Sequence, residues 1–404
     1  MYVISSLGCD DRTTPSTDVL INNMDSVGVH DDFELRWRKQ TTKPQICRGT
    51  FVYEKGVVFF IQEMKSNSRD EILALDKQTG DTLWIWNEGP YFTNHRFILE
   101  NTLYFTAGTS VFAIDCFTGQ TKWQYVPPTN LAYMSLSVSD MGVYVSYQDR
   151  RPNPQNNETT LYEISPSGIA TEVFRINAND RDGFTFSFDH ITPWKHSNGD
   201  IILFCESRSW NFGPANKGRA DYVSINKDRR QIYHDWGNLF QTIDIGGKSV
   251  RIEDEIFISS GWNQIAAIDL ANKKSIWLSS IPDQFATSSL LPVHQLNDKI
   301  FLSIGNFGHL NIVDTEAGKL IKSVSDLGTD WFATRFINYK DMAWFTTTTG
   351  LYSIDEFGKK YASLPNEQYV NESIGGFTNG MDIDTSSGLL YALRGEAFVC
   401  IQIK

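Results

Sequence analysis

Short apolar segments, each preceded by a turn-forming sequence, recur along almost the whole chain. Clear examples are residues 57–61, 102–106, 201–205 and 389–393, which follow turns containing Gly, Asn, Asp or Ser. Runs of this length between such turns indicate β-strands, because strands are short and turns need residues that tolerate special backbone angles. Helical periodicity is nearly absent. The pattern therefore predicts an all-β chain.

A second type of segment repeats with its parts in the same order. An alternating apolar strand ends at Asp, a turn follows that contains Gly, and a second strand leaves carrying Trp or another large residue; the copies include residues 72–84, 111–123, 267–277, 312–318 and 352–358, with degenerate copies at 161–164 and 222–226. Gly supplies the positive φ that the turn needs, and the Asp side chain can accept hydrogen bonds from turn N–H groups. We therefore assign these Asp and Gly residues a structural role.

The spacing of the repeat predicts the architecture. The turn positions 76, 115, 165, 226, 269, 314, 355 and 402 lie roughly 40 to 60 residues apart, close to the repeat of four-stranded propeller blades, which is ~40–45 residues. The sequence thus predicts an all-β, eight-bladed β-propeller of four-stranded blades that occupies residues 33–404 as a single domain. Residues 1–32 are polar and without pattern, and we expect them to form a signal remnant or tether.

The two ends of the chain complement each other. The last copy, residues 397–402, stops at Lys404 with no strand after it, whereas residues 33–39 form a Trp-bearing strand with no sheet of its own. Pairing this N-terminal strand with the C-terminal blade would close the ring and remove an exposed edge. We expect closure of this kind.

Composition and charge narrow the class of partner. Aromatic residues make up 13% of the chain and glycines number 29, which suits many short strands joined by tight turns. The net charge of −12, without a cluster of Lys and Arg, argues against nucleic acid, because binding to phosphates requires clustered cations. No apolar run approaches the ~18 residues of a membrane-spanning helix. We expect a monomer that reaches a membrane only through a lipid anchor.

Five cysteines are scattered without a CxxC pair, which suits neither a zinc site nor a disulfide framework. Cys9 is distinctive, because Leu7-Gly8-Cys9 followed by Asp10-Asp11 resembles the lipidation site of a bacterial lipoprotein, and the acidic pair resembles a surface-export signal. Met1 to Gly8 has no basic residue and is short for a signal peptide. A start codon upstream and a chance match are the two alternatives. We expect Cys9 to be lipidated and the protein to lie in the bacterial cell envelope, anchored to the outer membrane and either periplasmic or exposed at the surface.

The repeat A-[IL]-D-x-x-T-G-x-x-x-W is similar to that of the pyrroloquinoline-quinone (PQQ) family of eight-bladed propellers. This family includes quinoprotein alcohol dehydrogenases and the non-enzymatic, BamB-like lipoproteins of the outer-membrane barrel-assembly machinery. The resemblance spans roughly residues 45–404 and implies architecture rather than activity. Many enzymes of the family carry two adjacent cysteines against the quinone, which this chain lacks. A calcium-binding set of Glu, Asn and Asp residues cannot be assigned to matching positions either.

Other chemical motifs are incomplete. The segment 246–249 (Gly-Gly-Lys-Ser) lacks the earlier Gly of a phosphate loop, because position 242 is Thr. The seven histidines show no ligand spacing, and Asp189 and His190 are neighbours on a strand, so they point to opposite faces. We assign no catalytic residue, no metal ligand and no cofactor.

Loop lengths locate the functional face. In an up-and-down blade the connections between second and third strands, and those between blades, leave at one face, and this face carries the insertions 148–158 and 207–218. It also receives the starts of the innermost strands, which are aromatic and polar. The candidate residues for ligand or partner binding are His95, Arg96, Tyr133, Asp189, Trp210, Phe212, Trp331 and Arg335. Inter-blade packing is the alternative role for the aromatic residues.

Taken together, the sequence favours a non-catalytic binding or scaffold protein of the envelope that presents this face to a protein or glycan. The alternative is a PQQ-dependent, quinoprotein-like oxidoreductase that uses PQQ and calcium. A glycan-cleaving propeller would need a catalytic set that the sequence does not reveal.

Overall fold

A computed structural model describes most of the chain. It covers residues 32–40, 45–53, 55–64, 70–89, 92–128, 130–149, 158–177, 188–211, 217–237, 250–252, 255–259, 264–280, 294–297, 300–304, 310–324, 336–347, 350–365, 377–394 and 397–404. Every regular element among these residues is a β-strand, as predicted. No helix in the described part is long and apolar enough to cross a membrane.

The strands form eight four-stranded antiparallel sheets within the described residues. Sheets 1 to 4 comprise β2 (Gln45–Tyr53), β3 (Val57–Met64), β4 (Glu71–Asp76) and β5 (Thr82–Trp86); β6 (Phe92–Leu99), β7 (Thr102–Ala107), β8 (Ser110–Asp115) and β9 (Thr121–Tyr125); β10 (Leu131–Ser139), β11 (Gly142–Asp149), β12 (Glu158–Ile164) and β13 (Ala170–Asn177); and β14 (Phe188–Lys195), β15 (Ile201–Asn211), β16 (Lys217–Asn226) and β17 (Gln231–Gly237).

Sheets 5 to 8 follow the same order, except that the last contains strands from both chain ends. They comprise β18 (Val250–Ile252), β19 (Glu255–Ser259), β20 (Gln264–Asp269) and β21 (Lys274–Ser280); β22 (His294–Leu296), β23 (Ile300–Ile304), β24 (Leu310–Asp314) and β25 (Leu320–Val324); β26 (Ile337–Tyr339), β27 (Met342–Thr347), β28 (Gly350–Ile354) and β29 (Lys360–Pro365); and β30 (Phe377–Asp384), β31 (Leu389–Arg394), β32 (Ala397–Ile403) and β1 (Phe33–Gln40).

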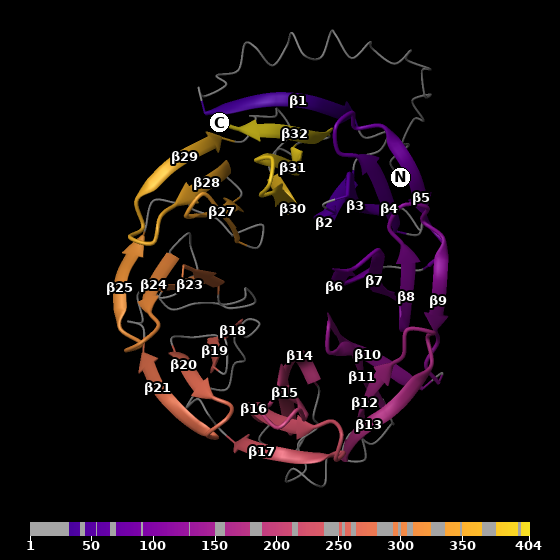
Figure 1. Cartoon of the computed structure of the whole chain (residues 1–404), viewed down its shortest axis with the longest axis vertical. Coiled ribbons are helices and arrows are strands. Elements are labelled where there is room, and N and C mark those ends of the chain that lie inside the picture. The colour runs from indigo at the N-terminus through magenta and orange to yellow at the C-terminus, as the bar shows by residue number, and fades with distance from the viewer. Residues whose placement is uncertain are drawn as a thin grey trace, which may run out of the picture.

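The sheets are arranged around a ring, with the first strand of each sheet toward the centre and the fourth at the periphery (Figure 1). Inner strands of adjacent sheets contact each other: β6 contacts β10, and β10 contacts β14. The first and last sheets are joined in the same way, because β2 contacts β30. This radial arrangement of small sheets is that of a β-propeller.

The N-terminal strand lies in the C-terminal sheet, as its unpaired Trp-bearing sequence predicts. β1 is the outermost strand of sheet 8 and pairs antiparallel with β32, from Phe33 opposite Ile403 to Gln40 opposite Ala397. The backbone N–H of Lys404 also donates to the carbonyl of Asp32 at 3.0 Å. The outer edge of β32 is therefore covered by a strand from the other end of the chain.

The core is divided among the junctions between sheets. Within the described residues the buried apolar side chains form eight clusters, and each lies between two adjacent sheets. The cluster between sheets 8 and 1 contains Trp37, Phe60, Tyr391 and Phe398, and the rings of Phe60 and Phe398 lie 4.1 Å apart. Each sheet thus buries both faces, so an isolated sheet would expose two apolar surfaces.

The Asp and Gly residues of the repeat act as predicted. At the turn between β4 and β5, the Asp76 carboxylate accepts hydrogen bonds from the N–H groups of Gln78 (2.8 Å) and Thr79 (2.9 Å). Gly80 closes this turn at φ +75°, the left-handed region that favours glycine. The carboxylates of Asp115 and Asp314 accept equivalent bonds in sheets 2 and 6. Their structural role is confirmed.

The Trp of the repeat bridges to the next sheet. The Trp37 ring lies against Gly80, where an added Cβ would be 2.9 Å from the ring, and its indole N–H donates to the Lys77 carbonyl at 2.9 Å. The same contact is made by Trp84 on the turn at Gly119 and by Trp277 on the turn at Gly318. The recurring order Asp, Gly, Trp in the repeat therefore joins adjacent sheets at these three junctions.

Candidate functional site

The two faces of the ring differ in their connections. The short turns between first and second strands, and between third and fourth strands, leave at one face, which we call the turn face. The connections between second and third strands, and those between sheets, leave at the other, which we call the loop face. The loop face is the one favoured by the sequence. Phe212, Trp331 and Arg335 lie outside the described residues, as does Cys9.

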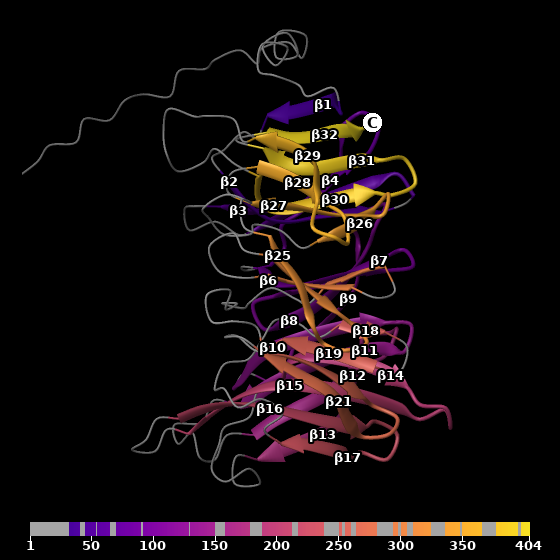
Figure 2. The same cartoon turned by 90° about the vertical axis from the view of Figure 1, so that its left-hand side faces the viewer.

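One hairpin at the loop face is much longer than its counterparts. β15 and β16 pair over ten positions, from Ile202 opposite Asn226 to Asn211 opposite Lys217, whereas β7 and β8 pair over six and β19 and β20 over five. The flanking strands stop earlier: β14 pairs with β15 only as far as Ser207, and β17 pairs with β16 only as far as Tyr222. We call residues 208–211 and 217–221 the β15–β16 ribbon; it extends beyond the other strands on one side of the molecule (Figure 2).

Three further candidates lie on strands near this face. Trp210 lies in the ribbon, opposite Gly218. His95 lies on β6 and Asp189 on β14, and for all three residues the side chain is outside the description. The backbone thus places Trp210 at the projecting ribbon and the other two on inner strands of sheets 2 and 4.

The two remaining candidates, Arg96 and Tyr133, are integrated into the fold. Arg96 on β6 is only 6% exposed and lies opposite Phe105, beyond an irregular stretch of the β6–β7 ladder. Tyr133 on β10 is half-buried, and its ring packs edge-on against Tyr147 at 6.2 Å between centroids. The Tyr147 hydroxyl in turn donates to the Thr109 carbonyl at 2.8 Å. The Tyr133 ring therefore packs on its cross-strand partner within sheet 3, and its binding role stays a prediction.

Buried carboxylates near the loop face were not anticipated from the sequence. Asp70, 2% exposed, accepts a hydrogen bond from the N–H of Phe92 at 2.6 Å, so it ties the start of β4 to the start of β6 in the next sheet. Asp149 accepts from the Asn130 side chain at 3.0 Å, and Glu206 is fully buried opposite His190. A buried carboxylate requires such partners. No sequence signal separates them from the many turn aspartates.

Metal ligands and thiols are the groups whose chemistry the described side chains define most directly. Within the described ranges, no three His, Cys, Asp or Glu residues gather to hold a metal ion. Cys116, Cys205 and Cys400 are free thiols buried in separate sheets. Burial raises the pKa of Cys116 and of Cys400 to about 12, and it raises that of Cys205 as well. These thiols stay protonated at neutral pH and pack as small apolar residues.

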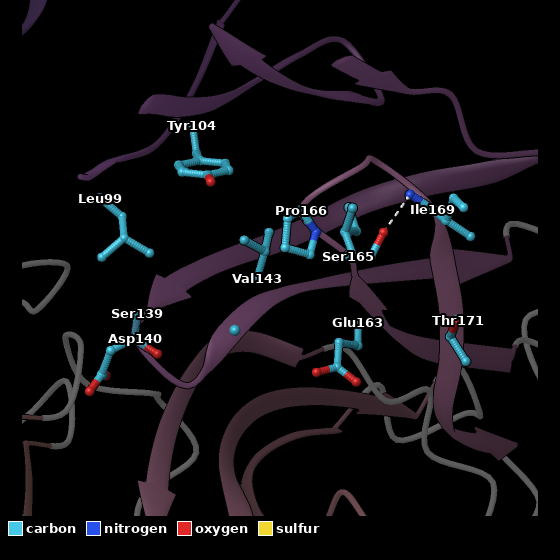
Figure 3. Close-up of a pocket in the computed structure, with 12 residues that line it drawn as sticks. Leu99, Tyr104, Ser139, Asp140, Val143, Glu163, Ser165, Pro166, Ile169 and Thr171 are labelled. Carbon is cyan, nitrogen blue, oxygen red and sulfur yellow. Dashed lines mark hydrogen bonds between the residues drawn. The ribbon is translucent and has the colours of Figure 1, made fainter. Parts of the chain in front are cut away.

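A pocket of about 350 Å³ lies on the turn face, between sheets 2 and 3 (Figure 3). Its lining includes Leu99 and Tyr104 from sheet 2, and Asp140, Val143 and Pro166 from sheet 3. It also includes Glu163, whose carboxylate accepts a hydrogen bond from Lys227 of sheet 4 at 3.2 Å. The lining residues include no His, Cys, Lys or Arg, so the pocket lacks a base or a nucleophile of those types.

The turn that borders this pocket is shorter than several of its counterparts. In sheets 1, 2 and 6 the Gly N–H bonds to the Asp carbonyl four residues earlier, and the second turn residue is buried, as for Lys77, Cys116 and Thr315. In sheet 3 the Gly168 N–H bonds to Ser165, three residues earlier, and Pro166 is exposed. The turn of sheet 3 is therefore one residue shorter than those of sheets 1, 2 and 6, and its Pro166 lines the pocket.

Comparison with known proteins informs the fold. No family profile and no curated protein sequence matches the chain significantly. Among solved structures, a europium-containing methanol dehydrogenase is similar over 89% of this chain and 84% of its own, with a TM-score of 0.63 and 10% identity. Sqt1 of Saccharomyces cerevisiae is similar over 91% of this chain and 98% of its own, also with a TM-score of 0.63 and 10% identity.

BamB from Moraxella catarrhalis also matches, over 92% of this chain and 98% of its own, at 11% identity and a TM-score of 0.45. Identities this low carry information on fold and none on activity. The two matches with a TM-score of 0.63 and the radial sheets together show that the chain is a β-propeller.

Proposed function

We propose that the protein is a non-catalytic binding or scaffold protein that presents its loop face to a partner protein. The observation that carries this proposal is the β15–β16 ribbon, which continues past both flanking strands of sheet 4. Beyond these flanking strands, β15 and β16 pair only with each other among the described strands. A projecting two-stranded ribbon also supplies convex surface, which suits contact with another macromolecule better than the enclosure of a small molecule.

The proposal includes a closed scaffold of eight blades. Its support is the pairing of β1 with β32, the contact between β2 and β30, and the apolar cluster between sheets 8 and 1. A ring with every junction packed holds the loop face rigid, which lowers the entropy lost on binding.

An envelope location, with Cys9 as lipid attachment site, is part of the proposal and rests on Leu7-Gly8-Cys9-Asp10-Asp11 alone. Mass spectrometry of the protein expressed from an extended upstream reading frame tests it. A diacylglyceryl adduct on Cys9 is expected. An unmodified Cys9 in a membrane-free fraction would remove the anchor from the proposal and leave the binding role intact.

The binding role is tested by shortening the ribbon. Ser207 lies opposite Asp221, so residues 208–220 can be replaced by Asn-Gly, a pair that forms two-residue hairpin turns. Affinity purification from the native host should recover a specific partner with the natural chain and lose it with the shortened one. The matched control is Lys274→Ala, an exposed change on the turn face. An unchanged set of partners for the shortened chain would refute the proposal.

The alternative, a PQQ-dependent oxidoreductase, is favoured only by the shared fold. The described residues do not fit its cofactors, because they include no cluster of metal ligands and no adjacent cysteines. We therefore assign no step of a PQQ-dependent reaction to the described residues. Added PQQ with calcium should leave the melting temperature and dye-linked activity unchanged. A rise in both at saturating cofactor would favour the enzyme instead.

A further inference from the structure

The β15–β16 ribbon differs in charge from the rest of the protein. Its described residues include three cations, Arg208, Lys217 and Arg219, and a single carboxylate, Asp221, whereas the whole chain carries a net charge of −12. Opposite charges attract partners over about 8 Å at physiological ionic strength. The ribbon is thus a local positive feature on an acidic molecule.

The register places these cations where no carboxylate opposes them. Arg208 lies opposite Ala220, Arg219 opposite Ser209 and Lys217 opposite Asn211. Directly opposite residues share a face of a ribbon, and successive pairs alternate between faces. By register, Lys217 and Arg219 therefore share one face with Asp221, and Arg208 belongs to the other, so no carboxylate is directly opposite a cation in the ribbon.

The ribbon also has two strand edges. Among the described strands, β14 follows β15 only to Ser207, and β17 follows β16 only to Tyr222. Beyond these positions, the ribbon strands pair with no other strand that the structure describes. Such an edge can accept an additional strand through backbone hydrogen bonds.

From charge and edges together, we infer that the ribbon binds an extended, acidic segment of a partner protein by strand addition. This inference rests on the proposed binding role and specifies its partner. Backbone hydrogen bonds from the edge would align the segment, and carboxylates at alternate positions would meet the cations. An anionic glycan could satisfy the cations, but it has no peptide backbone to extend the ribbon.

The probe is a fluorescein-labelled twelve-residue peptide of alternating Glu and Val, followed by anisotropy against the full chain. Binding is expected to weaken with salt and to be lost in the ribbon-shortened chain. The triple variant Arg208→Glu, Lys217→Glu, Arg219→Glu should bind at least about tenfold more weakly. The matched control reverses three cations elsewhere, Lys274, Lys319 and Lys322, and should leave affinity unchanged.

Two further probes separate the sources of affinity. A Lys and Val peptide of the same length should not bind. An N-methylated copy of the acidic peptide, which cannot donate backbone hydrogen bonds, should bind much more weakly. Equal binding of the N-methylated copy, or equal binding of heparin as an anionic glycan, would overturn strand addition by a peptide.

The outcomes distinguish the two proposals. If the natural partner is lost on shortening the ribbon but retained by the charge-reversed chain, the acidic partner is wrong and the binding role stands. If the shortened chain still binds the partner, the proposed binding role of the loop face is refuted. Melting curves show whether each variant is folded. If the triple variant does not fold, the single change Arg219→Gln takes its place. An Arg219→Gln chain that binds the acidic peptide as tightly as the natural chain would count against the inference.

Discussion

At the scale of single residues, the glycine of the repeat turn makes room for a tryptophan ring from the neighbouring sheet. The Gly80 turn needs a positive φ, and the absence of a Cβ leaves room for the Trp37 ring from the neighbouring sheet. Gly199 has a similar φ of +93° but nothing within 4 Å of the Cβ position. The two glycines therefore separate backbone strain from loss of the contact with tryptophan.

We predict that Gly80→Ala destabilises the protein more than Gly199→Ala. The latter should cost about 1 kcal/mol, from the left-handed backbone alone. The former adds displacement of the indole and should cost about 2 to 4 kcal/mol. Chemical denaturation of the two variants measures the difference. Equal losses would mean that the Trp37 contact contributes nothing.

A buried ion pair joins the first and last sheets. The Lys77 ammonium lies 2.6 Å from the Asp384 carboxylate, and both side chains are less than a tenth exposed. Burial by itself would raise the pKa of Asp384, but hydrogen bonds from Lys77, Ser386 and Ser387 outweigh it and lower the pKa to about 2. The folded state therefore favours the charged carboxylate.

This pair predicts a specific acid sensitivity. Because the folded pKa lies below the unfolded value, the stabilisation is complete above about pH 4 and is lost as the pH falls toward 2. It amounts to about 2 kcal/mol. Asp384→Asn should destabilise the protein at pH 7 and flatten the decline in stability between pH 4 and 2. The exposed Asp341→Asn is the control. A parallel decline in both variants would contradict the assignment.

At the scale of elements, one hairpin differs from the others in length. Most strands end where the sheet ends, but β15 and β16 continue beyond both neighbours. The sequence places an insertion at 207–218, and the structure shows that much of it extends two existing strands. An insertion in the sequence cannot reveal whether its residues pair.

We predict that the ribbon is dispensable for folding. Replacing residues 208–220 by Asn-Gly removes pairs that involve no third strand among the described residues. The melting temperature should change by less than about 3 °C, a small fraction of the stability of a domain. Differential scanning calorimetry measures it. A large drop would show that the ribbon supports the scaffold.

At the scale of the whole molecule, each sheet is stabilised by its two neighbours. The apolar clusters lie between sheets, and the junction of sheets 8 and 1 has the same Trp contact as the junction of sheets 1 and 2. Removing one junction would expose apolar surface on two sheets. The ring should therefore unfold as a unit.

Deletion of residues 33–39 tests this prediction. It removes the outer strand of sheet 8 together with Trp37, so the melting temperature of the entire protein should fall by well over 5 °C. The control is deletion of residues 1–31, which leaves β1 in place. An unchanged, single cooperative transition after deletion of 33–39 would contradict a stabilising role for β1.

The sequence by itself determined the strands, the turns and the order of the sheets, since alternation, Asp and Gly act over a few residues. It also indicated that the Trp37 strand belongs with the C-terminal sheet. The tertiary structure alone decided which side chains meet across a junction: Asp384 is 307 residues from Lys77, and Asp70 binds the start of the next sheet. Local patterns cannot encode such contacts, because they depend on how sheets stack around the ring. For the same reason the packing of Tyr133 on Tyr147 and the projection of the β15–β16 ribbon could not be foreseen from the sequence.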